Sequence, residues 1–595
     1  MRASHRRRWL AAAAAAITVG SLVLIADLPA SAASTVSVAA GTTFQTIDGF
    51  GVSEAFGQAN AIRNLAGGPR QRALDLLFST TSGAGFSILR SLIPSDASSI
   101  EPNAPSGPSA TPNYVWTGND AQDQGQLWLA KQAKNYGVTT FYNNAWSAPG
   151  YMKTNNSESN GGSLCGTTGA SCGSGDWRQH YANYLVQHTK LWAAAGVIPS
   201  AVGFVNEPSL TTTYSSMLVS PSQAASFLSV LGPTMRASGL STKVTCCETL
   251  GFNLLPSYIT AVASNPDVGL FTSHGYANAP TTAIDTRGRP VWESEWSING
   301  NTWTNVWDST GEASGITWAQ RIHNGLTGAN LNAFLYWWGI SSTSHDSSLI
   351  GLSGSTLTPS KRYYALANYS RFVRPGSVRI NATSPDSNLK TSAFRNPDGT
   401  IAVVTLNTAS SAIATSYSVS GAGSSSGTVT PYLTNTNSDT AAQASLALTS
   451  GVFSTTVPAR SLVTYVVKPG PVTPPPTSGS PSPTPTNSSA TPPPTGGVCT
   501  ATYAVVNSWP GGYQAEVSVA NTRSTSLDGW TVRWTIPSGQ TISQLWNGTL
   551  TTSGSSATVR NLAWNGALGA GAGTTFGLLA SGTPGSSPTL TCSSP

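Results

Sequence analysis

Charged side chains are scarce in this chain. Aspartate, glutamate, lysine and arginine make up 9% of its 595 residues, against about 25% in an average soluble domain. The formal net charge of +6 is scattered, and neither a basic patch nor a nucleic-acid-binding motif is present. We therefore expect no nucleic-acid partner. The 18 tryptophans, 59 glycines and 38 prolines favour uncharged ligands with apolar faces, bound among long loops.

Long hydrophobic runs are also lacking, except at the N-terminus. Arg6-Arg7-Arg8 precedes an alanine-rich apolar stretch that reaches Ile25, and Ala30-Ser31-Ala32 follows. This order is typical of a signal peptide, which we place at residues 1–33. The arginines also fit a twin-arginine signal, and the general secretory route is equally open. Because no second apolar run of about 20 residues occurs, we expect a secreted, extracellular protein without a membrane anchor.

Metal-binding residues are few. The chain has six histidines, no HExxH motif and no CxxC pair, so we expect neither a metal nor another cofactor. Six cysteines in an exported chain indicate disulfides. Their spacing suggests the pairs Cys165–Cys172 and Cys499–Cys592. Adjacent Cys246 and Cys247 can form either a vicinal bridge or two buried thiols, and the sequence leaves both open.

Two short apolar runs each stop at a glutamate. They are Gly203-Phe204-Val205-Asn206-Glu207-Pro208 and Pro290-Val291-Trp292-Glu293-Ser294-Glu295. Glu207 and Glu295 are 88 residues apart (295 − 207). In a (β/α)8 barrel about 90 residues separate strands three units apart, which would place the two carboxyl groups across the barrel mouth from each other. Such a pair can cleave a glycosidic bond, one carboxyl protonating the leaving oxygen and the other attacking the anomeric carbon.

Several segments resemble glycoside hydrolase family 30, a retaining family with a (β/α)8 TIM barrel and an attached side β-sandwich. The segments are Ile47-Asp48-Gly49-Phe50-Gly51, Gly85-Phe86-Ser87-Ile88-Leu89-Arg90, Asn144-Ala145-Trp146-Ser147-Ala148-Pro149, Asn206-Glu207-Pro208, Trp292-Glu293-Ser294-Glu295 and Tyr336-Trp337-Trp338. The resemblance extends from about Val36 to Lys468. It implies a secreted enzyme that hydrolyses polysaccharides.

The resemblance assigns roles to the two glutamates. Glu207 would be the general acid/base and Glu295 the nucleophile. Glu293 remains a competitor, because a strand period of two would place it on the same face as Glu295. Asn206 would hydrogen-bond the sugar 2-hydroxyl, a contact that strengthens in the transition state.

Other residues of the same motifs would complete the site. Arg90 and Tyr276 are the expected donors to Glu295, and Trp146 would stack on the sugar. Adjacent strand residues point to opposite faces, so only one of Trp337 and Trp338 should line the site. We expect that residue to be Trp338.

The first loop bears on the substrate. Residues 51–60 look most like the xylanase-type subfamilies of the family and favour β-1,4-xylan. Gln58 stands where several of these xylanases would carry an arginine for 4-O-methylglucuronate, and Arg63 lies five residues on, so glucuronate dependence and endo or exo action stay open. The alternatives are a β-1,6-glucanase, a β-1,6-galactanase, a xylobiose-releasing exo-xylanase and a non-catalytic wall-binding protein.

Composition divides the rest of the chain. We assign residues 34–47 to the first strand of the side sandwich, 48–376 to the barrel, 377–468 to the sandwich, 469–497 to a Pro/Thr/Ser-rich linker and 498–595 to a binding module. The module resembles carbohydrate-binding module family 2, in which Trp509, Trp546 and Trp564 would form a planar aromatic row. Three rings favour cellulose over xylan as its ligand. The protein is expected to be a monomer.

Overall fold

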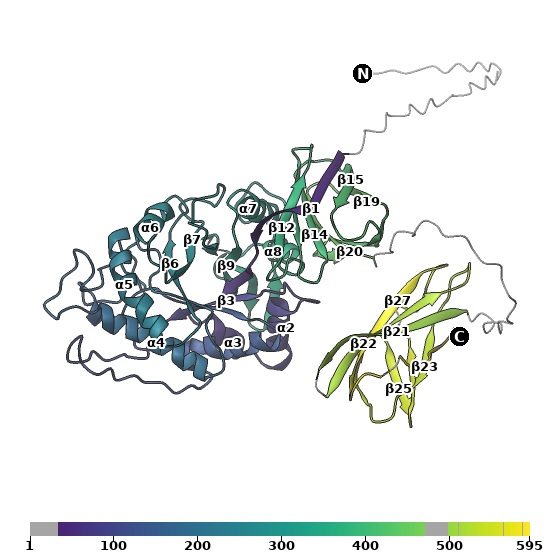
Figure 1. Ribbon diagram of the computed structural model, residues 1–595, viewed down its shortest axis with the longest axis horizontal. Coiled ribbons are helices and arrows are strands. Elements are labelled where there is room, and N and C mark those ends of the chain that lie inside the picture. Colours follow the sequence, from purple (N-terminus) through teal and green to yellow (C-terminus); the bar gives the residue numbers. More distant parts are fainter. Residues whose placement is uncertain are drawn as a thin grey trace, which may run out of the picture. The chain divides into compact units, whose positions relative to one another are not determined.

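The computed structural model describes residues 34–300, 302–470, 498–509, 511–562, 565–585 and 587–594 (Figure 1). The chain divides into two compact units, Met1–Pro475 and Pro476–Pro595. The signal peptide assigned to residues 1–33 and residues 471–497 of the assigned linker lie outside the described residues. In the part of the chain that the structure describes, no helix is both long and apolar enough to span a membrane.

A closed parallel barrel forms the centre of the first unit. Its strands are β2 (Gly49–Ser53), β3 (Ile88–Ile93), β4 (Thr140–Ala145), β5 (Ala201–Gly203), β6 (Lys243–Thr249), β7 (Val268–His274), β8 (Val291–Trp296) and β9 (Ala333–Ser342). Each pairs in parallel with the next, and β9 pairs with both β8 and β2, which closes the ring. Beyond β9, β10 (Ser348–Ser353) and β11 (Thr356–Pro359) extend the sheet. The strand residues are buried almost throughout, as expected for a parallel sheet that is covered on both faces.

Helices follow every barrel strand except β7, which leads to β8 without a helix, and they cover the barrel from outside (Figure 1). They are α1 (Gln58–Arg63), α2 (Gly67–Phe78), α3 (Gln126–Asn135), α4 (Arg178–Ala194), α5 (Pro221–Ala237), α6 (Leu255–Ala261), α7 (Gly315–Thr327) and α8 (Lys361–Ser370), with the 3-10 turns η1 (Gln122–Gly125) and η2 (Gly150–Met152). Helix α5 begins with a capping box between Ser220 and Gln223. The predicted (β/α)8 barrel is confirmed.

The side sandwich is built from the two ends of the first unit. Its strands are β1 (Ser34–Thr46), β12 (Val378–Thr383), β13 (Leu389–Arg395), β14 (Ile401–Asn407), β15 (Ile413–Ser420), β16 (Gly427–Thr434), β17 (Ala441–Ala442), β18 (Leu446–Leu448), β19 (Val452–Val457) and β20 (Ser461–Pro469). Strand β1 lies between β12, antiparallel, and β15, parallel. Along β14, Ala402 and Val404 pack into the barrel's apolar core while Ile401 and Val403 pack inside the sandwich. This alternation joins barrel and sandwich into one body.

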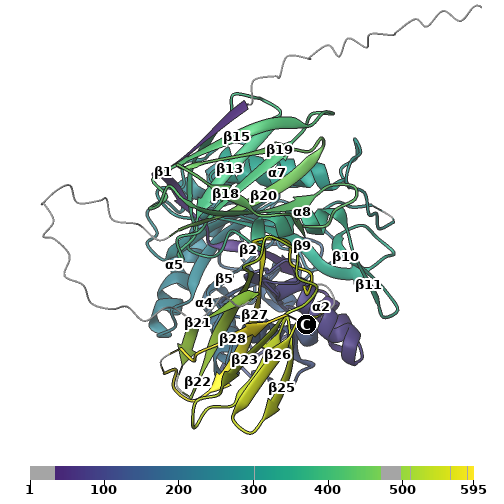
Figure 2. The same cartoon turned by 90° about the vertical axis from the view of Figure 1, so that its right-hand side faces the viewer.

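The second unit is an all-β sandwich (Figure 2). One four-stranded sheet has the order β21-β22-β27-β24 and the other β25-β26-β23-β28. The strands are β21 (Cys499–Trp509), β22 (Gly512–Asn521), β23 (Thr531–Thr535), β24 (Ile542–Trp546), β25 (Thr549–Ser553), β26 (Ser556–Arg560), β27 (Gly573–Ser581) and β28 (Thr591–Ser593). Buried Trp530 and Trp534 stack against Phe576 between the sheets.

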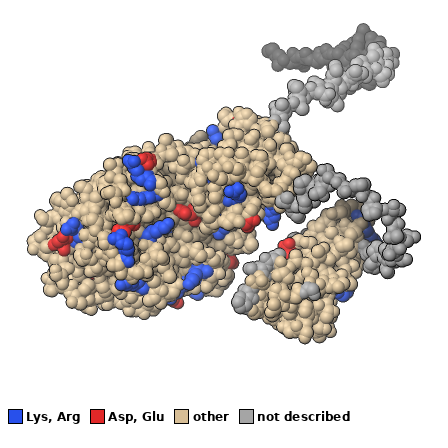
Figure 3. Space-filling view, viewed as in Figure 1, with Lys and Arg blue, Asp and Glu red and all other residues tan. Residues whose placement is uncertain are grey.

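All six cysteines are paired. The structure contains the disulfides Cys165–Cys172 and Cys499–Cys592. It also joins Cys246 to Cys247, so of the two possibilities left open by the sequence the vicinal bridge is the one observed. Figure 3 shows how sparse and interspersed the charged side chains are on the visible face, in keeping with the low charge content of the sequence.

Candidate active site

A pocket of about 500 Å³ opens among the loops that follow the barrel strands. It is lined by Phe56, Trp146, Asn206, Glu207, Leu210, Tyr214, Leu250, Tyr276, Glu295, Asn299, Trp337, Trp338 and Ser347. The carboxyl ends of the strands are the face on which barrels of this kind carry their active sites. Aromatic walls with a few convergent polar groups make this pocket the candidate site.

The two glutamates predicted to act as a pair meet in this pocket. Glu207 comes just after β5 and Glu295 lies near the end of β8. One carboxylate oxygen of each, and one ring nitrogen of His274, lie within 4.8 Å of one another. Glu207 is 6% exposed and Glu295 is 5% exposed. Both carboxyl groups can therefore reach a single bond of a molecule in the pocket.

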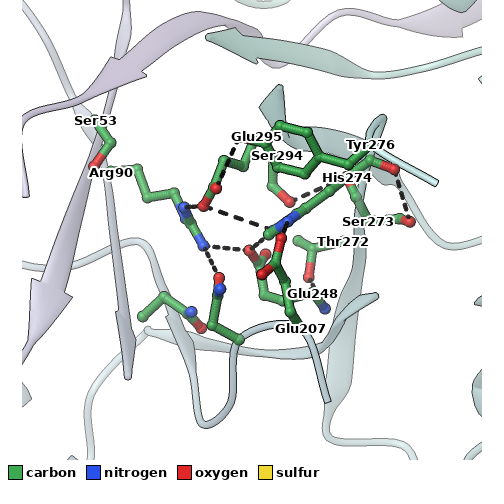
Figure 4. A network of polar contacts seen from close by, with 12 residues as sticks. Ser53, Arg90, Glu207, Glu248, Thr272, Ser273, His274, Tyr276, Ser294 and Glu295 are labelled. Atoms are coloured by element: carbon green, nitrogen blue, oxygen red, sulfur yellow. Dashed lines mark hydrogen bonds and ion pairs between the residues drawn. The ribbon is translucent and has the colours of Figure 1, made fainter. Parts of the chain in front are cut away.

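Arg90 and Tyr276 both contact Glu295 (Figure 4). Arg90, fully buried at the centre of β3, forms an ion pair from Nη1 to Glu295 Oε2. The Tyr276 hydroxyl donates a hydrogen bond to Glu295 Oε1 at 3.1 Å. Arg90 Nη2 also donates to Asn206 Oδ1 at 2.7 Å. This contact fixes the orientation of the Asn206 side chain, so that its amide N–H groups can donate to a ligand in the pocket.

Two residues of the network, Glu248 and His274, were not among the sequence-predicted site residues. His274 spans two glutamates, with Nδ1 3.0 Å from Glu207 Oε1 and Nε2 2.8 Å from Glu248 Oε2. Glu248 also forms an ion pair with Arg90 Nη2 and accepts a hydrogen bond from the Tyr142 hydroxyl at 2.8 Å. Like the two glutamates that were selected, Glu248 ends an apolar strand sequence, and that signal could have identified it.

The electrostatics of the network fix most of its charges. Burial alone would lower the pKa of His274, but the Glu295 charge and the hydrogen bonds to Glu207 and Glu248 raise it to about 10. Burial would raise the pKa of Glu248, yet Arg90 and His274 lower it to about 2. Burial raises the pKa of Glu295 above its ordinary value, against the opposing effect of His274 and Arg90. At neutral pH His274 and Arg90 are therefore cations and Glu248 is an anion.

The same charges argue against metal binding here. Glu207, His274 and Glu295 are the described residues that lie close enough together to share an ion. The raised pKa of His274, about 10, keeps both ring nitrogens protonated. A protonated imidazole has no lone pair to offer a metal.

The expectation that Glu293 shares a face with Glu295 is wrong. The pairing of β8 with β7 matches Ser273 to Glu293 and His274 to Glu295, so β8 carries one extra residue at Ser294. A bulge of this kind breaks the alternation of side chains. Glu293 is fully buried away from the pocket lining, its carboxyl oxygens have no hydrogen-bond partner, and burial raises its pKa well above the ordinary value.

The expectation that only one of Trp337 and Trp338 lines the site is also wrong. Both line the pocket, and their rings stack with centroids 5.1 Å apart. The pairing of β9 with β2 skips Trp337, matching Val52 to Tyr336 and Ser53 to Trp338, so this strand is bulged as well. The Trp337 ring lies 5.7 Å from that of Trp146, whose ring also lies 4.4 Å below the Arg90 guanidinium.

In the second unit, the structure describes one of the three tryptophans assigned to the binding face. Trp546 ends β24 and is half-buried. Its ring lies over Gly577 on β27, where an added Cβ would come within 2.2 Å of the ring atom Cζ2. The side chain of Trp509 and the whole of Trp564 lie outside the described residues.

Three family models match the chain. They are "O-Glycosyl hydrolase family 30" over residues 33–278, "Glycosyl hydrolase family 30 beta sandwich domain" over 376–465 and "Cellulose binding domain" over 499–594. Among solved structures, the catalytic domain of the family 30 xylanase C from Talaromyces cellulolyticus is 43% identical with a TM-score of 0.69, and the match covers 73% of this chain and 100% of that one.

Two curated proteins illustrate the two parts of the chain. Endoglucanase A from Thermobispora bispora is 62% identical over 98 residues. The match covers 16% of this chain and only 22% of the length of the endoglucanase. Endo-1,6-beta-D-glucanase BGN16.3 from Trichoderma harzianum is 25% identical over 398 aligned residues, and the match covers 61% of this chain and 78% of that one.

A (β/α)8 barrel with two glutamates that reach one bond at its mouth is the structure of a glycoside hydrolase. The chain belongs to glycoside hydrolase family 30, and it carries a C-terminal cellulose-binding domain.

Proposed function

We propose that the protein is a secreted, retaining glycoside hydrolase that cleaves β-1,4-xylan and is held on plant cell walls by its cellulose-binding domain. The observation that carries the proposed stereochemistry is the closeness of Glu207 and Glu295, whose nearest carboxylate oxygens lie within 4.8 Å. Retaining enzymes hold their two carboxyl groups about 5 Å apart, whereas inverting enzymes leave about 6.5–9.5 Å for a water molecule.

The first step breaks the bond between two sugars. Protonated Glu207 transfers its proton to the glycosidic oxygen while the Glu295 carboxylate attacks the anomeric carbon. The bond from that carbon to the leaving oxygen breaks, the leaving sugar departs as an alcohol, and an ester joins Glu295 to the remaining sugar. In the second step Glu207 takes a proton from water, whose oxygen attacks the same carbon and releases Glu295. Two inversions leave the configuration unchanged.

The neighbours of Glu295 prepare it for attack. The Arg90 ion pair and the Tyr276 hydrogen bond favour the ionised carboxylate in a buried position that by itself would favour the protonated form. Arg90 also holds Asn206 by its oxygen, which directs the amide nitrogen to the sugar 2-hydroxyl. These donors act on the nucleophile and on the sugar next to it.

Neutral, flat sugars suit the rest of the pocket. Trp146, Trp337, Trp338, Phe56 and Tyr214 line it, and aromatic faces match the apolar faces of a pyranose. Among the similar proteins, the 43% identity to a xylanase over that protein's whole catalytic domain favours xylan. The 25% identity to an endo-1,6-β-glucanase makes β-1,6-glucan the second candidate.

Secretion and wall binding fit the same proposal. The signal-peptide pattern in residues 1–33 provides for export. A cellulose-binding domain joined to the catalytic unit raises the concentration of xylan around the active site, because xylan lies against cellulose in plant walls.

Product analysis with matched variants tests the proposal. The protein without residues 1–33 is incubated with glucuronoxylan, arabinoxylan, β-1,6-glucan and β-1,6-galactan, and early products are followed by proton NMR. We expect xylo-oligosaccharides released first as the β-anomer. Glu207→Gln and Glu295→Gln should abolish release, while Glu293→Gln, which replaces a buried neutral carboxyl by a neutral amide, should remain active.

Each alternative gives a different result. Products first seen as the α-anomer would contradict the retaining mechanism. Release from β-1,6-glucan alone would keep the catalytic pair and overturn the substrate. An active Glu295→Gln with an inactive Glu293→Gln would reverse the assignment of the nucleophile, and inactivity on all four polymers would favour a wall-binding protein.

A further inference from the structure

The carboxylate of Glu248 lies beneath the catalytic pair and does not line the pocket. It contacts groups from three other barrel strands, namely Arg90 on β3, Tyr142 on β4 and His274 on β7. Its side chain is fully buried at 1% exposure. A group in this position cannot touch the bond that is cleaved, but it touches the residues that hold both catalytic glutamates.

The backbone of Glu248 is tied to the acid/base residue as well. The Glu207 N–H donates to the Glu248 carbonyl oxygen at 2.9 Å. Both residues have positive φ, 44° for Glu207 and 53° for Glu248, in the left-handed region that side chains larger than glycine rarely adopt. Residues in such conformations persist where the surrounding contacts determine them, and they gather at functional sites.

The network pairs two positive side chains with two negative ones. Arg90 and His274 are cations, and Glu248 and Glu295 are the anions that face them. These four charges sum to zero. His274 lies between Glu207 and Glu248, so the charge of Glu248 reaches the acid/base residue through one shared imidazole. Glu248 provides half of the negative charge in this balance.

The other ionisable groups around the network leave this count unchanged. Tyr142 and Tyr276 have pKa values raised well above the ordinary one by burial, so both are neutral hydrogen-bond donors. Glu293, which interacts electrostatically with His274 and Glu248, has a pKa raised well above the ordinary value by burial and is also neutral.

We propose that Glu248 is a positioning residue that sets the protonation of the catalytic pair, by holding His274 and Arg90 as cations between Glu207 and Glu295. The inference rests on the proposed double-displacement roles of Glu207 and Glu295. It adds that the working pH of the enzyme depends on a carboxylate that never contacts the substrate.

The test is the pH profile of Glu248→Gln in the chain without residues 1–33, measured as kcat and KM on xylan. With one anion removed, the excess positive charge favours the ionised forms of Glu207 and Glu295. Both limbs of the kcat profile should then move to lower pH by about one unit, a typical effect of a nearby charge. At neutral pH kcat should fall by up to about tenfold while KM changes less than about threefold, because the change shifts the ionisation of the catalytic pair and leaves the sugar contacts in place.

Two variants serve as controls. Glu248→Asp keeps the charge on a shorter side chain and should return the profile most of the way to that of the wild type. Glu293→Gln, equally buried and neutral in both forms, should leave the profile unchanged. A Glu248→Gln profile that is reduced in height with both limbs in place would show a structural role only and would overturn the proposal.

A second measurement does not depend on the folding of a variant. In the wild type labelled with ¹⁵N-histidine, the imidazole assigned to His274 should keep protons on both ring nitrogens up to about pH 9, in line with its pKa of about 10. If all the histidines are neutral at pH 8, the charge balance is absent and the proposal fails. If the wild type cleaves none of the polymers, the proposed function fails first, and the NMR result still decides the charge of His274.

Discussion

Replacing Arg90 by lysine should damage both activity and stability, because one guanidinium serves three acceptors. Arg90 contacts Glu295, Glu248 and Asn206, and it is fully buried. Lysine keeps the positive charge but offers a single point of contact, so it cannot reproduce the planar, forked geometry. We expect at least two of the three hydrogen bonds to be lost.

The size of the effect follows from these contacts. A hydrogen bond to a charged group contributes about 1.5–3 kcal/mol. Losing the one that orients Glu295 should lower kcat/KM on xylan about 10-fold to 100-fold, at about 1.4 kcal/mol per factor of ten. Leaving buried carboxylates without their partner should lower the free energy of unfolding by about 3–5 kcal/mol.

Steady-state kinetics and urea unfolding measure the two effects separately. Arg362→Lys is the matched control, because Arg362 is equally buried and donates to Asp346 and to backbone oxygens but contacts neither Glu207 nor Glu295. It should lose stability and keep kcat/KM within about threefold of the wild-type value. Wild-type kcat/KM in Arg90→Lys would refute the role given to the Arg90 fork.

Two further predictions concern pH and cellulose. The pKa of Glu248 is lowered from 4.5 to about 2, so its stabilising contribution is present above pH 4.5 and is lost as the pH falls toward 2. The pKa of His274 is raised from 6.5 to about 10, so its stabilising contribution is complete below pH 6.5 and is lost as the pH rises through 10. Thermal unfolding of the first unit should therefore have its highest Tm between about pH 4.5 and 6.5 and fall on both sides, and a Tm that keeps rising to pH 9 would contradict this. In the second unit, Gly577→Ala should displace the Trp546 ring, which lies 2.2 Å from the position of the new Cβ, and weaken cellulose binding in a pull-down assay. Gly569→Ala, where an added Cβ meets no neighbour within 4 Å and φ is not positive, is the comparison, and equal binding by both variants would argue against Trp546 as a cellulose contact.

The sequence was sufficient to predict the barrel and the meeting of Glu207 and Glu295 in one pocket. Strand ends in a (β/α)8 barrel follow one another at a regular interval, so the spacing of Glu207 and Glu295 and the motifs around them were enough to place both at the mouth. Arg90 and Tyr276 could be placed for the same reason, since each follows or belongs to a recognisable strand motif.

The errors have a common physical origin. Alternation of side chains fails where a strand takes an extra residue, as β8 does at Ser294 and β9 does at Trp337. Such bulges arise from pairing with neighbouring strands and leave no mark in the strand's own sequence. Glu248 carries the same strand-end signal as Glu207 and Glu295, but its contacts with His274, Arg90 and Tyr142 join four different strands, which only the folded chain brings together.

The position of β1 has a consequence for the order of folding. This first strand of the described chain pairs with β12 and β15, so that Ser37 lies opposite Thr383 and beside Ser418. Its partners are synthesised more than 330 residues later, and pairings between such distant residues form slowly. During synthesis β1 therefore stays without its pairing partners until β12 and β15 have left the ribosome. Shielding it during that interval, for example by a chaperone, should raise the yield of folded enzyme.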